Sequence, residues 1–328
     1  MNSARRRALA AFAIAAVWIW WHARAGGFYF IVGMEGEASA NLGPILPAFC
    51  AGLSAAPALL IANATAGAIA GVLAAMVLVL LPGFLSLHLE SLVGPPLLAL
   101  TLFMLAVMIN APRFSLAYGT LAATAAAFVS PQAIGLPVGA AVWAFVQRAQ
   151  PTSMRRRAGL ALLPLVAAVV LLRFNADRWL GGSALGWRGE LDRVFRAAGT
   201  IIGNQLVPGV THATVRFFGI ADLALLAIAV VVVAWRRVAR AVPDTALLRR
   251  LYPAAGVLAL FYAIGLAIRT LLVRGAPVPD LVSVIPLAAV SVVVIMTSVV
   301  TLWPMWPRWG KALAFVMIAG WLQAAIRA

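Results

Sequence analysis

Two carboxylates, Glu35 and Glu37, stand in the segment Phe28–Phe49, between two long apolar runs. The chain has only nine Asp and Glu residues among 328, so two of them in one short segment are conspicuous. Carboxylates in a partly enclosed site can take a proton from a reacting group or hold a polar ligand. These residues are therefore the first candidates for chemistry, and the alternative is a solvated surface loop.

A second polar pair, His88 and Glu90, lies in LPGFLSLHLESLVGPP, again between two apolar runs. Residues i and i+2 do not share a face of a helix, so the pair is badly placed to bind one metal ion. The other two histidines, His22 and His212, are each isolated and supply no clear third ligand. We therefore predict no metal site, and the pair either contributes to a binding site or forms a polar turn.

The elements that must position these residues are apolar helices. The chain is 64% hydrophobic and 10% charged, and its apolar residues occur in long runs. Lipid offers no partners for exposed backbone groups, so such runs cross a membrane as helices. We expect one all-α transmembrane domain over residues 1–328. Taking about 15 to 22 residues for each span, the sequence predicts about eleven: 8–22, 45–61, 64–81, 92–110, 115–130, 133–147, 158–172, 217–235, 251–272, 281–302 and 312–326.

The charges predict the orientation of these spans. With Arg5, Arg6 and Arg7 in the cytoplasm and the sides alternating, most of the 25 basic residues fall on the inner face, as the positive-inside rule requires. Most of the nine acidic residues then fall in outer loops: Glu35, Glu37, Glu90, Asp177, Glu190, Asp192 and Asp280. This asymmetry favours a polar site on the outer face, although a solvated outer surface would look the same.

The N-terminal 25 residues also resemble a secretory signal, because three arginines precede an apolar stretch and Ala23-Arg24-Ala25 resembles a cleavage site. We favour a retained anchor, since Trp18, Trp20 and Trp21 are typical of an interfacial belt. The loops after residue 25 are assigned to the same sides of the membrane whether or not the N-terminal segment is cleaved.

The longest connection, residues 173–216, is too long for a simple turn. Apolar residues recur there at helical spacing opposite Arg188, Glu190, Arg193 and Arg196, which predicts an amphipathic helix on the outer membrane surface within 174–216. Such a helix either covers the ends of the spans or lines a groove for a charged lipid headgroup.

Other patterns narrow the class of protein. The single Cys50 excludes an intramolecular disulfide. The net charge of +16 comes from residues scattered at the ends of spans, which argues against nucleic-acid binding. Charged residues are sparse within the spans, which counts against a pump. The small-residue patterns at Gly67–Gly71 and Gly135–Gly139 predict close packing between helices of this chain.

The order of these features resembles the C-type (GT-C) glycosyltransferases, which take sugars from polyprenyl phosphates, such as protein O-mannosyltransferases and lipid A aminoarabinose transferases. The resemblance is carried by a basic N-terminus, one span, an acidic outer loop and GPILPAF. It continues through residues 57–107, through the passage GTLAATAAAFVSPQAIGLPVGAAVWAFV and, more weakly, in PDLVSVIPLAAVSVVVI. It covers roughly the first 170 residues and one later segment.

The resemblance implies roles for particular residues. The family's acid in the first outer loop falls on Glu35 or Glu37, which would act as the general base, and its acid at the start of the fourth span falls on Glu90. Glu90 would position the acceptor or the sugar, with His88 beside it. The lipid phosphate would be held by arginines, which suit bidentate oxygen contacts: Arg188, Arg193, Arg196 and Arg274.

The resemblance therefore implies an inverting glycosyltransferase of the inner (plasma) membrane that acts on the outer, periplasmic face. Its partners would be a polyprenyl-phosphate-linked sugar and membrane lipids, with no nucleic acid. It would need no nucleotide cofactor, and a divalent cation is left open. The alternatives are a non-catalytic membrane subunit or lipid-binding protein of the same architecture, and a transporter of lipids or small molecules.

Overall fold

The computed structural model describes residues 3–25, 45–91, 93–110, 131–146, 246–272 and 281–303, together with a few isolated positions. Within these residues every regular element is a helix, which confirms the predicted all-α class. In chain order the elements are α1 (Ser3–Ala25), α3 (Ile45–Ala66), α4 (Ala68–Leu80), α5 (Pro82–Glu90), α6 (Gly94–Asn110), the 3-10 turn η1 (Pro131–Ile134), α8 (Gly135–Val146), α12 (Ala246–Leu272) and α13 (Leu281–Leu302).

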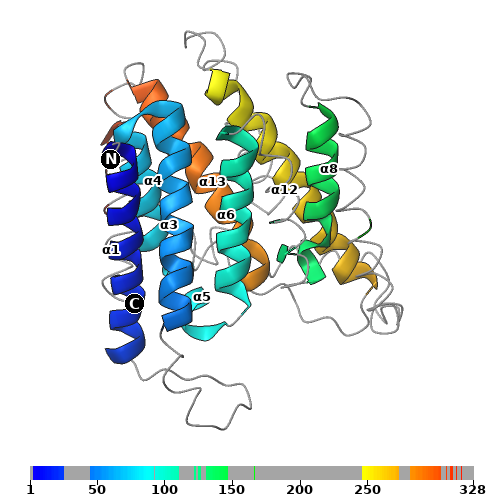
Figure 1. Ribbon diagram of the computed structural model, residues 1–328, viewed down its shortest axis with the longest axis horizontal. Helices are drawn as coiled ribbons and strands as arrows, with labels where there is room; N and C mark the ends of the chain where they lie inside the picture. The colour runs from blue at the N-terminus through cyan, green and yellow to red at the C-terminus, as the bar shows by residue number, and fades with distance from the viewer. Residues whose placement is uncertain are drawn as a thin grey trace.

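The long helices lie side by side and run in both directions along the bundle (Figure 1). Helix α3 contacts α1, α4 and α6, while α13 packs on α4, α3 and α6, and α8 packs on α12. We call the end of the bundle where α1, α4 and α12 begin the basic end. The opposite end, where α3, α6, α8 and α13 begin and where the short helix α5 lies, is the α5 end.

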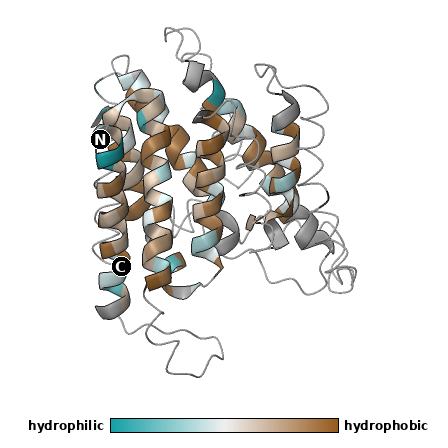
Figure 2. Cartoon of the chain, viewed as in Figure 1, coloured by the Kyte–Doolittle hydropathy of each residue, from teal (hydrophilic) through white to brown (hydrophobic). Residues whose placement is uncertain are grey.

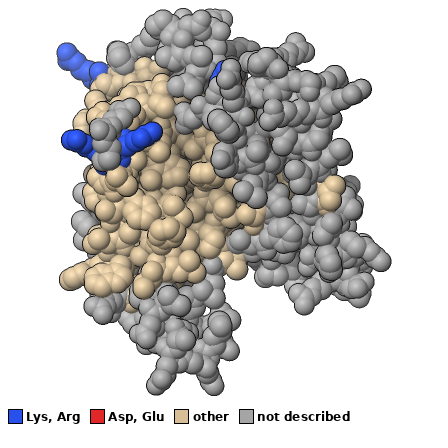
Figure 3. Space-filling view, in the orientation of Figure 1, with Lys and Arg blue, Asp and Glu red and all other residues tan. Residues whose placement is uncertain are grey.

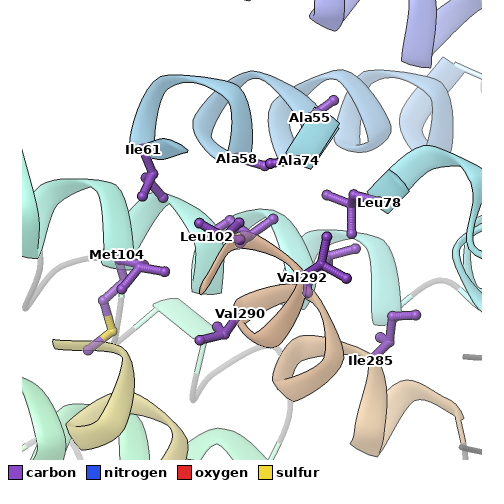
Figure 4. Packing of buried hydrophobic residues seen from close by; sticks show 14 of the residues in the cluster. Ala55, Ala58, Ile61, Ala74, Leu78, Leu102, Met104, Ile285, Val290 and Val292 are labelled. Carbon is purple, nitrogen blue, oxygen red and sulfur yellow. The ribbon is translucent and has the colours of Figure 1, made fainter. Parts of the chain in front are cut away.

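The core is built from small side chains on α3 and α4 and larger ones on α6 and α13. Figure 4 shows Ala58 of α3 and Ala74 of α4 facing Leu102 of α6, with Val292 of α13 beside them. These side chains are buried. Alanines at the contact let the helix backbones approach closely, and close approach strengthens the van der Waals contacts that hold helices together in an apolar solvent.

The reversal between α3 and α4 depends on glycine. Gly67 is the one residue between the two helices and has φ = 91°, a conformation that favours glycine. One turn later, a Cβ added at Gly71 would lie 2.8 Å from the Leu59 carbonyl oxygen and 2.8 Å from the Asn63 Cβ. The first small-residue pattern thus packs α4 tightly on α3, as predicted.

The second small-residue pattern packs α8 on α12. A Cβ added at Gly135 would collide with the Phe261 carbonyl oxygen, and one at Gly139 would lie 3.0 Å from the Phe261 Cβ. The packing of α8 therefore requires glycine at position 135. The sequence prediction of contacts within the chain is confirmed at both patterns.

Buried hydroxyl groups are satisfied inside their own helices. Ser54, Thr101 and Thr297 each donate to the carbonyl oxygen four residues earlier, at 2.9, 2.8 and 2.7 Å. This bonding satisfies these three hydroxyls, and it is the usual solution where water is absent.

By length and composition, α3 is the one described helix able to cross a membrane by itself. Helix α4 and residues 83–89, bent by 60°, make a second candidate if the pair forms one broken span. The described residues thus support one or two spans and do not support the predicted number of eleven. Residues 158–172 (apart from Val166) and 217–235 lie outside the described residues, as does most of 115–130 and 312–326.

Candidate functional site

The α5 end contains a short helix that the sequence did not predict. The chain leaves α4 through Leu81, which is extended, and Pro82 begins α5 in the first turn, where proline fits because it needs no hydrogen-bond acceptor. After α5, the hydroxyl of Ser91 accepts a hydrogen bond of 2.9 Å from the backbone N–H of Gly94 and so caps α6. The prediction of a polar turn at this position is wrong, since α5 is a helix with buried Phe84, Leu85 and Leu87.

His88 lies on the buried side of α5. Its ring is fully buried, and Nδ1 lies 2.7 Å from the Phe84 carbonyl oxygen. The carbonyl can only accept, so Nδ1 carries the proton, and in the neutral ring Nε2 is an acceptor. Nε2 has no hydrogen-bond partner. The ring also packs on that of Phe84, with centroids 4.2 Å apart.

The same arrangement occurs on α1 at the α5 end. Nδ1 of His22 lies 2.9 Å from the Trp18 carbonyl oxygen, and the two rings are 4.2 Å apart. Nε1 of Trp18 is buried without a partner. His22 looks isolated in the sequence. A sequence signal for the contact nevertheless exists, because an aromatic residue is followed by a histidine four positions later both in Trp18–His22 and in Phe84–His88.

Most of the predicted site residues lie outside the described residues. These are Glu35, Glu37, Arg188, Arg193, Arg196 and Arg274, and the predicted amphipathic helix within 174–216 lies outside them too. Glu90 is the last residue of α5, and only its backbone is described. Positions 88 and 90 of this helix do not share a face, as their spacing predicted.

The helix termini that flank several of these residues in the sequence nevertheless lie at one end of the molecule. Residues 26–44, which include Glu35 and Glu37, join the end of α1 to the start of α3, and both helices contact α5. Arg274 lies in the connection from α12 to α13, and α13 also contacts α5. Figure 1 shows these helix termini at the α5 end.

The basic end differs chemically from the α5 end. The basic side chains that the structure describes are Arg5, Arg6, Arg7, Arg250, Arg308 and Lys311. Those visible in Figure 3 gather where α1 and α12 begin. No acidic side chain is among the described ones.

No group of three or more His, Cys, Asp or Glu side chains that could hold a metal ion occurs in the described part of the chain. Comparisons with protein-family models, with curated proteins and with solved structures gave no match. The likeness to the GT-C glycosyltransferases thus depends on the order and spacing of sequence features.

Proposed function

We propose that this chain is a polytopic protein of the inner (plasma) membrane, with its basic end in the cytoplasm and its α5 end on the outer face. Large apolar side chains are exposed on the outside of the bundle, among them Ile14 at 67%, Trp21 at 65% and Ile69 at 69%. Figure 2 shows hydrophobic residues along much of the length of the described helices. Water disfavours such a surface, whereas lipid solvates it. The eleven-span count belongs to this proposal, and the described helices supply part of it.

The proposed activity is transfer of a sugar from a polyprenyl-phosphate donor to an acceptor hydroxyl at the α5 end. The observation that supports it is the convergence on α5 of α1, α3 and α13, whose connections hold Glu35, Glu37 and Arg274. A site that combines carboxylates with arginines has both groups that this reaction needs.

In the proposed reaction, Glu35 or Glu37 takes the proton of the acceptor hydroxyl as its oxygen bonds to C1 of the sugar. The bond from C1 to the phosphate oxygen breaks, and its electron pair leaves with the polyprenyl phosphate. Arginines hold the phosphate as its negative charge grows, with Arg274 from the α5 end and Arg188, Arg193 and Arg196 from the long connection as candidates. Glu90 positions the acceptor or the sugar.

His88 has a different role in this proposal. Its ring is fully buried, so a substrate cannot touch it in the described arrangement. We assign to the His88 ring the role of holding α5 in place. Because Glu90 is the last residue of α5, the ring thereby also positions Glu90.

The test is transfer from a radiolabelled donor in proteoliposomes that contain the full-length protein, with membrane extract from the native cells as the source of acceptor. Polyprenyl-phosphate mannose and polyprenyl-phosphate aminoarabinose are the donor probes. Replacing both Glu35 and Glu37 by Gln removes the base, so we expect transfer to fall by about 10² to 10⁴-fold. Asp177→Asn is the control, because it removes an outer carboxylate to which we assign no role.

The result also separates the alternatives. Undiminished transfer in the double Gln variant contradicts the assignment of the base. Donor binding without any transfer by the unchanged protein favours a lipid-binding subunit, and movement of labelled donor across sealed vesicles favours a transporter.

A further inference from the structure

Arg7 is a partly buried cation that the described protein does not neutralise. Its Nη2 donates a hydrogen bond of 3.2 Å to Oδ1 of Asn63, which joins α1 to α3 through a neutral amide. Its Nε is buried and has no acceptor. No carboxylate is described near it, because none of the described side chains is acidic.

Arg5 and Arg6 add two exposed cations in the first turns of α1. The N-terminus of a helix is already the positive end of its dipole and is normally stabilised by anions, yet the first turn of α1 contains no acidic residue. None of the described side chains offsets this positive charge. An external anion would do so.

Apolar side chains are exposed at the same end of the bundle as these cations. Leu9 is four residues after Arg5, on the same face of α1, and is 57% exposed. Ile69 is exposed at the start of α4, which also begins at the basic end and contacts α1. A molecule that carries a phosphate group at the head of an acyl chain would place its negative charge on the arginines and its apolar chain on Leu9 and Ile69.

We propose that the start of α1 binds an anionic phospholipid, with its phosphate on Arg5, Arg6 and Arg7 and an acyl chain along Leu9 and Ile69. This inference depends on the proposed membrane location and is independent of sugar transfer. The protein would hold this lipid in the cytoplasmic leaflet, at the end opposite to α5.

The test uses native mass spectrometry of the full-length protein in detergent, titrated with phosphatidylglycerol or with phosphatidylcholine of the same acyl chains. Arg7→Gln and Asn63→Ala form a matched pair, because both break the bond between α1 and α3 but only the first removes charge. We expect Arg7→Gln to weaken phosphatidylglycerol binding about fivefold, and the double variant Arg5→Gln/Arg6→Gln about twenty-five-fold. Asn63→Ala should bind within about twofold of the unchanged protein.

Arg308→Gln, which removes an exposed arginine that follows α13, is the charge control and should weaken phosphatidylglycerol binding less than Arg7→Gln does. Equal losses in Arg308→Gln and Arg7→Gln, equal binding of phosphatidylcholine, or release of the lipid by inorganic phosphate would each overturn the proposal. If Arg7→Gln does not fold, the double variant decides, since Arg5 and Arg6 are exposed and make no described contact between helices. Loss of sugar transfer with unchanged lipid binding would leave this site intact and contradict only the proposed activity.

Discussion

At the scale of single residues, the α5 end combines satisfied and unsatisfied polar groups. His88 gains one hydrogen bond from Nδ1, while its Nε2 is buried without a partner. A buried hydrogen bond contributes about 1 kcal/mol, and a buried unsatisfied acceptor costs about 1 to 3 kcal/mol. The two effects oppose each other, so the ring contributes to stability mainly by filling space.

This balance predicts the effect of two substitutions. His88→Leu removes both polar groups and keeps most of the volume, so we expect the stability to change by no more than about 1 kcal/mol. His88→Ala leaves a cavity beside Phe84 and should cost about 2 to 5 kcal/mol. Thermal unfolding in detergent, followed by tryptophan fluorescence, measures both. A His88→Leu variant as unstable as His88→Ala would show that the imidazole ring makes a further stabilising polar contact.

At the scale of elements, glycine decides which helices can touch. The sequence predicted seven of the described helices close to their observed positions: α1, α3, α4, α6, α8, α12 and α13. Their apolar runs end at Pro, Gly or charged residues, which limit both spans and helices. The sequence did not predict α5, because LSLHLE alternates apolar and polar residues and lacks helical periodicity. Its burial depends on α1, α3, α4, α6 and α13, which all contact it.

One glycine in the contact between α8 and α12 and one outside it give a matched prediction. Gly135→Ala places a methyl group against the Phe261 carbonyl oxygen and should lower stability by about 1 to 3 kcal/mol. Gly256→Ala on α12 meets nothing within 4 Å and should raise stability by about 0.5 to 1 kcal/mol, because alanine favours a helix. Thermal unfolding of the two variants compares them. An equal gain of stability in both variants would show that helix propensity, and not packing, decides the effect at position 135.

At the scale of the whole molecule, the basic residues of the described helices are distributed unequally between the two ends. The described arginine side chains of α1 and α12, which are Arg5, Arg6, Arg7 and Arg250, lie at the end where these helices begin (Figure 1, Figure 3). Arg24 and Arg269 occupy the last turns of the same helices, at the α5 end. An excess of arginine at one end is what the positive-inside rule expects of a membrane protein whose basic end is cytoplasmic.

The orientation can be tested with single cysteines in a background where Cys50 is replaced by Ala. Ser3→Cys lies at the basic end and Val93→Cys, at a position that is 41% exposed, lies at the α5 end. In intact cells a membrane-impermeant maleimide should label Val93→Cys and should label Ser3→Cys only after permeabilisation. The reverse labelling pattern would contradict the proposed orientation and would place the proposed site of sugar transfer in the cytoplasm.

Sequence patterns alone predict that the described chain is helical and where most of its helices lie. These properties depend on composition, on apolar run length and on breaking residues, which are local. Only the tertiary structure decided that LSLHLE forms a buried helix, that His88 is enclosed, and that Arg7 bonds to Asn63 across 56 residues. Such features depend on which side chains meet from distant parts of the chain, and run length and charge do not specify those contacts.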